Sequence, residues 1–218
     1  MLLADILQRI FSVPARLLLD FFFHFKVKGK ENLKELRNRG VILAANHGSF
    51  IDPPAIGAAL GPFSPFLPLR FLAKENFFKF PNFFFSGILF YVLGAFPVKR
   101  GLSDLGLTLK KGIEILKKGG TIVIFPEGKM TRIGDLKTGF GQLQKGRRGV
   151  AFLAQETGVP IVPIGLRGNF KALKLDIFFL RRRRLEVVFG KPIFISKELT
   201  LEQATDLVMF EIQKLLES

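Results

Sequence analysis

The sequence predicts an α/β protein with a largely parallel central sheet covered by helices. Short apolar runs alternate with amphipathic stretches along most of the chain, and 48% of its 218 residues are hydrophobic, enough for one substantial core. The runs expected as strands are 40–45, 71–73, 95–98, 121–125, 161–166 and 185–189. The stretches expected as helices lie near 82–93, 103–118, 145–157 and 201–216.

The N-terminal stretch is apolar and predicts two short helices. Leucines and isoleucines recur at helical spacing before Pro14, a Leu- and Phe-rich stretch follows, and three lysines come next between residues 26 and 30. Basic flanks beside an apolar helix face are typical of a helix in the membrane interface. We therefore expect residues 1–28 to form a membrane-associated helical hairpin and residues 29–218 to form the main domain. A hairpin packed into the core is the alternative.

A second apolar stretch covers residues 80–98, which carry no charge over 19 positions. That length formally reaches a transmembrane span. Prolines and an asparagine at its ends and glycines inside it equally suit a helix lying in or against the interface. We expect monotopic attachment.

Charge and composition narrow the class of function. Lys plus Arg number 33 against 18 Asp plus Glu, a net charge of +15, so the surface should attract nucleic acid, acidic lipids, phosphorylated substrates or acidic carrier proteins. The absence of Cys excludes thiol catalysis and thiolate metal sites, and only two His exclude a multi-histidine zinc site. We expect no metal. The 26 Phe and the mean hydropathy of +0.30 are unusual for a nucleic-acid-binding protein.

The sharpest local pattern places His47 and Asp52 five positions apart, directly after a buried-looking strand. On a continuous helix the two side chains would point about 140° apart, so they meet only if a turn over 48–51 comes first. Asp52 precedes two prolines, which favours a helix beginning there. Asp52 could therefore cap a helix over 53–60, pair with His47, or do both. A histidine held by a carboxylate is a general base for a hydroxyl group.

Two further patterns follow strands. Phe125-Pro126-Glu127-Gly128 ends one strand and is followed by Lys129 and Arg132; it is not a phosphate-binding P-loop, because the first glycine and the Ser or Thr of that motif are missing. Lys99 and Arg100 follow the strand at 95–98, and such cations bind phosphate by charge and, for Arg, by a bidentate fork. An ordinary solvated edge is the alternative for this pair.

Taken in order, these segments resemble the lysophosphatidate acyltransferase (PlsC-like) family. Its NHxSxxD block is matched by Asn46, His47, Ser49 and Asp52, its short apolar strand ending in Arg by 96–100, its FPEG block by 125–128, and its VPxVPx strand by 159–164. The RFLAKE segment at 70–75 is also similar to the family's segment between the first two blocks.

The resemblance implies transfer of an acyl group from a thioester to the sn-2 hydroxyl of 1-acyl-sn-glycerol 3-phosphate, that is, lysophosphatidic acid. The donor would be acyl-CoA or acyl carrier protein, and no other cofactor or metal would be needed. The roles implied for the matched residues are these: His47 removes the hydroxyl proton, Asp52 fixes the His47 tautomer, Lys99 and Arg100 clamp the phosphate, Glu127 orients the glycerol part or its loop, and Gly128 lets the backbone approach the substrate.

One position departs from the family pattern. The family continues FPEG with a small residue and then Arg, whereas Lys129 and Met130 stand here and the next arginine is Arg132. Lys129 or Arg132 is therefore expected to substitute in binding the phosphate.

Two rival functions remain at the level of the sequence. One is an acyltransferase for glycerol 3-phosphate or another lysolipid; the other is a basic nucleic-acid-binding protein that uses 181–184 as its patch, although no recognised binding module is present. For the enzyme we expect anionic membrane lipids as partners, no nucleic acid, and a peripheral or monotopic location on the cytoplasmic face of the cell inner membrane.

Overall fold

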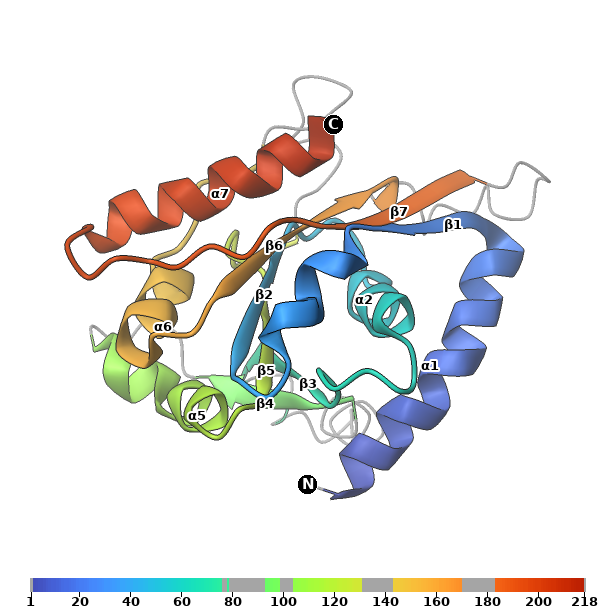
Figure 1. Ribbon diagram of the computed structural model, residues 1–218, viewed down its shortest axis with the longest axis horizontal. Coiled ribbons are helices and arrows are strands. Elements are labelled where there is room, and N and C mark those ends of the chain that lie inside the picture. The colour runs from blue at the N-terminus through green and yellow to red at the C-terminus, as the bar shows by residue number, and fades with distance from the viewer. Residues whose placement is uncertain are drawn as a thin grey trace.

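The computed structural model describes residues 2–75, 78, 93–98, 104–130, 143–169 and 183–217. In this part of the chain one sheet contains seven strands in the order β1-β7-β6-β2-β5-β3-β4 (Figure 1). The strands are β1 (Phe23–Lys28), β2 (Val41–Ala45), β3 (Leu69–Lys74), β4 (Ala95–Val98), β5 (Thr121–Ile124), β6 (Ile161–Arg167) and β7 (Arg183–Phe189). The helices are α1 (Leu2–Phe22), the 3₁₀ helix η1 (Lys30–Leu36), α2 (Asp52–Leu60), α5 (Leu105–Lys117), α6 (Gly149–Thr157) and α7 (Leu201–Glu217).

The sheet is parallel except at one pair of strands. β2 lies between β5 and β6 and pairs with both in parallel, and β3 continues the parallel sheet from β5 to β4. β6 and β7 are antiparallel, and β1 joins β7 in parallel at the edge. Helices on both faces bury such a sheet, so its central strands are apolar throughout. The predicted largely parallel α/β fold is confirmed.

Two hydrophobic layers separate the sheet from its helices. Figure 1 shows α1 and α2 on one face and α5, α6 and α7 on the other. Alternate residues of β2 enter the two layers: Leu43 packs with Leu19 of α1 and Ile56 of α2, whereas Ile42 packs with Leu116 of α5 and Val208 of α7. Packing on both faces therefore fixes the position of β2, and with it the position of the carboxyl end of the strand.

The expected N-terminal hairpin is wrong. α1 is one helix that runs through Pro14 and leads directly into β1. Pro14 removes the hydrogen bond to the Ile10 carbonyl, but Ile10 is exposed and water can reach that side of the helix. Contacts toward the protein hold the helix, including hydrogen bonds from Arg9 to the Pro62 and Leu67 carbonyls at 2.9 and 3.2 Å.

Residues 23–28 are a strand rather than the end of the apolar helical segment. Their side chains alternate, with Phe23 and Phe25 buried and His24 and Lys26 exposed. This alternation with a period of two predicts a strand, but the many apolar residues that precede it make the signal hard to see in the sequence. β1 is therefore part of the central sheet.

None of the helices in the described part of the chain is both long and apolar enough to cross a membrane. Of the second apolar stretch, residues 93–98 are described and include β4, while residues 80–92 lie outside the described residues.

The side chain of Gln8 fastens α1 to the edge of the sheet. Its amide nitrogen donates to the Leu69 and Leu93 carbonyls at 2.9 and 3.0 Å, and its oxygen accepts from Leu69 N–H at 2.7 Å. Gln8→Ala should lower the free energy of unfolding by about 1–3 kcal/mol, because the N–H and carbonyl groups of the buried residue Leu69 lose the bonds that Gln8 makes to them. Chemical denaturation would measure this. The matched control is Gln213→Ala, since Gln213 bonds Glu217 within its own helix; equal losses would contradict the assignment.

Candidate active site

Three neighbouring parallel strands deliver polar side chains to one edge of the sheet. His47 follows β2, Glu127 follows β5 and Asn169 follows β6. Because β5, β2 and β6 are adjacent and parallel, their carboxyl ends lie side by side. In α/β sheets this is the edge at which ligands bind. Residues up to 122 positions apart in the sequence therefore meet at one place.

His47 and Asp52 are in contact, as predicted. The His47 Nδ1 to Asp52 Oδ2 distance is 2.9 Å, and the chain between them makes a turn in which Asp52 N–H donates to the Ser49 carbonyl at 3.2 Å. The carboxylate is fully buried, whereas the imidazole retains 19% of its exposure. With Nδ1–H donated to Asp52, Nε2 is the nitrogen left to accept a proton.

Asp52 is the first residue of α2, and the alternative that it caps this helix is wrong. Ile51 is the N-cap and makes no side-chain cap. Asp52 Oδ2 instead accepts from the N–H groups of Gly48 and Ser49, at 2.8 and 2.9 Å, which lie in the turn before the helix. The carboxylate thus fixes the turn that brings His47 back to it.

Asn169 completes the surroundings of Asp52, and sequence reasoning missed it. Its Nδ2 donates to Asp52 Oδ1 at 3.0 Å, and the side chain is fully buried. Gly168 before it has φ +79° and lies so close to the Arg184 carbonyl that a Cβ would collide with it. A polar residue after a glycine, just beyond a buried apolar strand, was the available signal.

Glu127 holds the backbone of His47. Its Oε1 accepts from His47 N–H at 2.9 Å and its Oε2 from Gln144 N–H at 3.2 Å, and only 2% of its surface is exposed. Phe125, two residues earlier, stacks on the imidazole with a centroid distance of 4.2 Å and an interplanar angle of 21°. The FPEG turn therefore fixes both the backbone and the ring of His47.

Asn46 extends the sheet by one further pair of hydrogen bonds. Its Nδ2 donates to the Leu166 carbonyl at 3.0 Å, and its Oδ1 accepts from Leu166 N–H at 2.7 Å. The side chain thus bonds the backbone of β6 as the next residue of a paired strand would. The position of His47, the next residue, is set by this link on one side and by Glu127 on the other.

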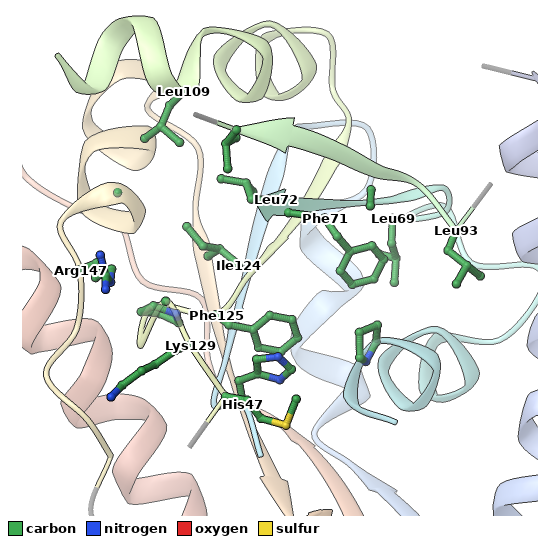
Figure 2. A pocket seen from close by; sticks show the side chains of 18 of the residues that line it. His47, Leu69, Phe71, Leu72, Leu93, Leu109, Ile124, Phe125, Lys129 and Arg147 are labelled. Carbon is green, nitrogen blue, oxygen red and sulfur yellow. The ribbon is translucent and has the colours of Figure 1, made fainter. Parts of the chain in front are cut away.

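A cavity of about 1220 Å³ opens beside His47. One part of its wall is apolar and is formed by α1, α2, β3 and β4. The other part is cationic and includes Lys129, Lys145 and Arg147. In Figure 2 Lys129 and Arg147 lie on one side of His47, and Leu69, Phe71 and Leu93 lie on the other. Such a cavity fits a molecule with an apolar and an anionic end.

The structure places only some of the expected phosphate-binding residues. Gly128 and Lys129 line the cavity. Lys99, Arg100 and Arg132 lie outside the described residues. Gly128 has φ +71°, and a Cβ there would collide with Arg147 Nε and Cδ, so a glycine is needed for both reasons. Sequence reasoning did not single out Arg147, because it is remote from the four blocks in the chain.

Removing the Asn169 side chain tests whether it positions the His47–Asp52 pair, referred to below as the dyad. Asn169→Ala leaves Asp52 Oδ1 without this partner, so we expect a loss of about 1–3 kcal/mol in unfolding free energy and a changed ¹⁵N spectrum of the His47 imidazole. Asn32→Ala is the matched control, because Asn32 Nδ2 donates to the Phe189 carbonyl at 3.0 Å. It should destabilise the fold without changing that spectrum. An unchanged His47 spectrum in Asn169→Ala would contradict a positioning role.

Curated acyltransferases are among the known proteins to which this chain is similar. A chloroplastic 1-acyl-sn-glycerol-3-phosphate acyltransferase of Brassica napus is 31% identical over 179 residues, 81% of this chain and 47% of the relative. A lyso-ornithine lipid O-acyltransferase of Pseudomonas aeruginosa is 30% identical over 152 residues, 70% of this chain and 50% of the relative. The chain spans about half the length of these two curated relatives.

The fold also has a counterpart among solved structures. The crystal structure of PlsC, the 1-acyl-sn-glycerophosphate acyltransferase of Thermotoga maritima, superposes with a TM-score of 0.70 at 24% identity, covering 96% of this chain and 77% of that chain. The sequence profile of the family described as Acyltransferase matches residues 24–167, which include β1 except its first residue, the His47–Asp52 pair, the FPEG turn and β6. The chain belongs to the Acyltransferase family.

Proposed function

We propose that the protein transfers a fatty acyl group from a thioester donor to the sn-2 hydroxyl of 1-acyl-sn-glycerol 3-phosphate, giving phosphatidic acid. The observation that carries the proposal is the His47–Asp52 pair beside a cavity with one apolar and one cationic wall. The name of the Brassica napus relative supports this acceptor. The donor is acyl-CoA or acyl-acyl carrier protein, and the reaction uses no metal or other cofactor.

The dyad performs the proton transfers of the reaction. His47 Nε2 takes the proton of the acceptor hydroxyl while its oxygen attacks the thioester carbonyl, and Asp52 stabilises the imidazolium that forms. Collapse of the tetrahedral intermediate breaks the carbon–sulfur bond, and His47 returns the proton to the departing thiolate. The new ester is phosphatidic acid, and the donor leaves as a free thiol.

The acceptor's own hydroxyl is the nucleophile, so the enzyme needs none. The chain has no Cys, and Ser49 is buried with its N–H bonded to Asp52. Glu127, with both oxygens accepting backbone N–H groups, acts by fixing His47 rather than by touching the glycerol part. Lys99 and Arg100 remain candidates for the phosphate on sequence grounds.

A second acceptor class has one observation in its favour. The Pseudomonas aeruginosa relative is named for a lyso-ornithine lipid, which is a different acceptor. The cations in the cavity wall favour a substrate with a phosphate monoester, because charge-assisted bonds to phosphate are strong. An acyl-transfer assay that offers lysophosphatidic acid and lyso-ornithine lipid separately, each with both donors, decides between the two.

His47→Ala should lower acyl transfer to lysophosphatidic acid about 10²–10⁴-fold, because the proton-transfer group is lost. The measurement is the initial rate with acyl-CoA or acyl carrier protein as donor. His24→Ala is the matched control, since His24 is an exposed histidine on the edge strand β1. Activity of His47→Ala within a few-fold of the wild type would rule out the mechanism.

We propose that α1 holds the enzyme on the cytoplasmic face of the inner membrane. The helix directs polar Gln8 and Arg9 toward the protein and a stripe of large apolar side chains outward. The exposed members of the stripe are Ile6, Ile10, Val13, Leu17, Leu18, Phe21 and Phe22. An outward apolar face is costly in water and suits an interfacial helix, and the positive net charge adds attraction to anionic lipids.

Phe21→Ser combined with Leu17→Ser should release the protein from membranes washed with high salt. Those side chains are 63% and 65% exposed, and apolar insertion persists when salt screens charges over about 10 Å at 0.1 M. Sedimentation of membranes after the wash is the measurement. The control is Phe194→Ser, a phenylalanine of similar exposure, 61%, between β7 and α7. Release of the wild-type protein by salt alone would contradict insertion of α1.

A further inference from the structure

The segment from Gln144 to Arg147 is fixed to the turn that holds His47. Gln144 N–H donates to Glu127 Oε2 at 3.2 Å, and Arg147 N–H donates to the Pro126 carbonyl at 2.8 Å. Between them Gly146 packs so closely on α7 that a Cβ would lie 2.6 Å from Thr205. The backbone of Arg147 is therefore held relative to the imidazole before any substrate arrives.

The Arg147 side chain lies over the glycine of the FPEG turn. Its Nε and Cδ occupy the space that a Cβ on Gly128 would need, and it lines the same cavity as His47. Among the described residues Arg147 has no ion pair, whereas its neighbour Arg148 pairs with Glu202 at 3.2 Å. Arg147 thus presents to the cavity a cation that forms no ion pair with an acidic side chain of the described residues.

The cavity wall on this side carries an excess of positive charge. Four cationic side chains line it, and two acidic ones, Glu202 and Asp206, do so as well. Glu202 is engaged by Arg148. Met130 also lines the cavity and is half-buried. It occupies the position of the arginine in the lysophosphatidate acyltransferase pattern, but its side chain has no charge with which to bind a phosphate.

We propose that Arg147 binds the phosphate of the acceptor in place of the arginine that Met130 replaces; this rests on the proposed function. The guanidinium group forms two parallel hydrogen bonds to phosphate oxygens, so it fixes orientation as well as position. The first turn of α6, which begins two residues later at Gly149, adds the favourable field of a helix N-terminus.

This placement explains which hydroxyl reacts. Arg147 lies on one side of His47 and the apolar wall on the other (Figure 2). An acceptor that extends its acyl chain along the apolar wall and its phosphate toward Arg147 spans the position of His47. The free hydroxyl between those two ends then meets Nε2. Anchoring both ends of a flexible molecule in this way supplies the orientation that proton transfer needs.

Arg147→Gln tests the proposal in the full-length protein. The KM for lysophosphatidic acid should rise about 10- to 100-fold, the loss expected for a charge-assisted hydrogen bond, while the KM for the acyl donor stays unchanged. The KM of Arg147→Lys for lysophosphatidic acid should lie between those of Arg147→Gln and the wild type, because the positive charge remains but the two parallel hydrogen bonds are lost. Arg147 is exposed and Gln retains the N–H that bonds Pro126, so the fold should persist; thermal unfolding checks this.

Arg39→Gln is the matched control, since Arg39 is an exposed arginine that does not line the cavity and its loss changes the net charge equally. Its KM values should equal those of the wild type. A second acceptor, 1-acylglycerol, lacks the phosphate, so its transfer rate should not respond to Arg147→Gln.

Three results would overturn the proposal: an unchanged KM for lysophosphatidic acid, an equal rise for the donor, or an equal loss with 1-acylglycerol. In each case a wild-type protein that acylates lysophosphatidic acid leaves the proposed function standing. If the wild type does not acylate that acceptor with either donor, the proposed function fails and the role of Arg147 fails with it.

Discussion

The buried carboxylate of Asp52 is the group on which the site depends. Moving an ionised carboxylate out of water costs several kcal/mol unless hydrogen bonds replace its hydration. Asp52 accepts from Gly48, Ser49 and His47 in its own turn and from Asn169 after β6. The folded chain can bury this charge only with that turn and that loop in place. The requirement for burial therefore also determines where the imidazole sits.

A second carboxylate extends the same constraint to β5. Glu127 is almost fully buried and accepts from His47 and Gln144. His47 is thus fixed through its ring by Asp52 and through its backbone by Glu127. Because Asp52 and Glu127 follow adjacent parallel strands, a shift of either strand would disturb both networks. The geometry of the dyad is a property of the sheet rather than of one loop.

The sequence predicted those features whose signal is local. β2, β5 and β6 were predicted from apolar runs, and the contact of His47 with Asp52 was expected on condition of a turn over 48–51, with which the two prolines after Asp52 agree. Asn169 and Arg147 escaped because their significance comes from strand order, which brings 169 beside 52 and 147 beside 128 only after folding. β1 escaped for a different reason, since the apolar run that precedes it obscured its alternation of buried and exposed residues.

The exposed apolar side of α1 connects the fold to the proposed acceptor. A helix on a soluble protein ordinarily keeps its large apolar side chains on its buried side, yet α1 buries Leu19 and also has Leu17 and Phe21 facing outward. The same helix contributes Phe11 and Ala15 to the apolar wall of the cavity. With its outer face in lipid, α1 would place that wall next to the acyl chains of the bilayer. An acceptor could then slide along α1 into the cavity with its acyl chain shielded from water throughout, and only its phosphate would need to leave the headgroup layer for the cationic wall.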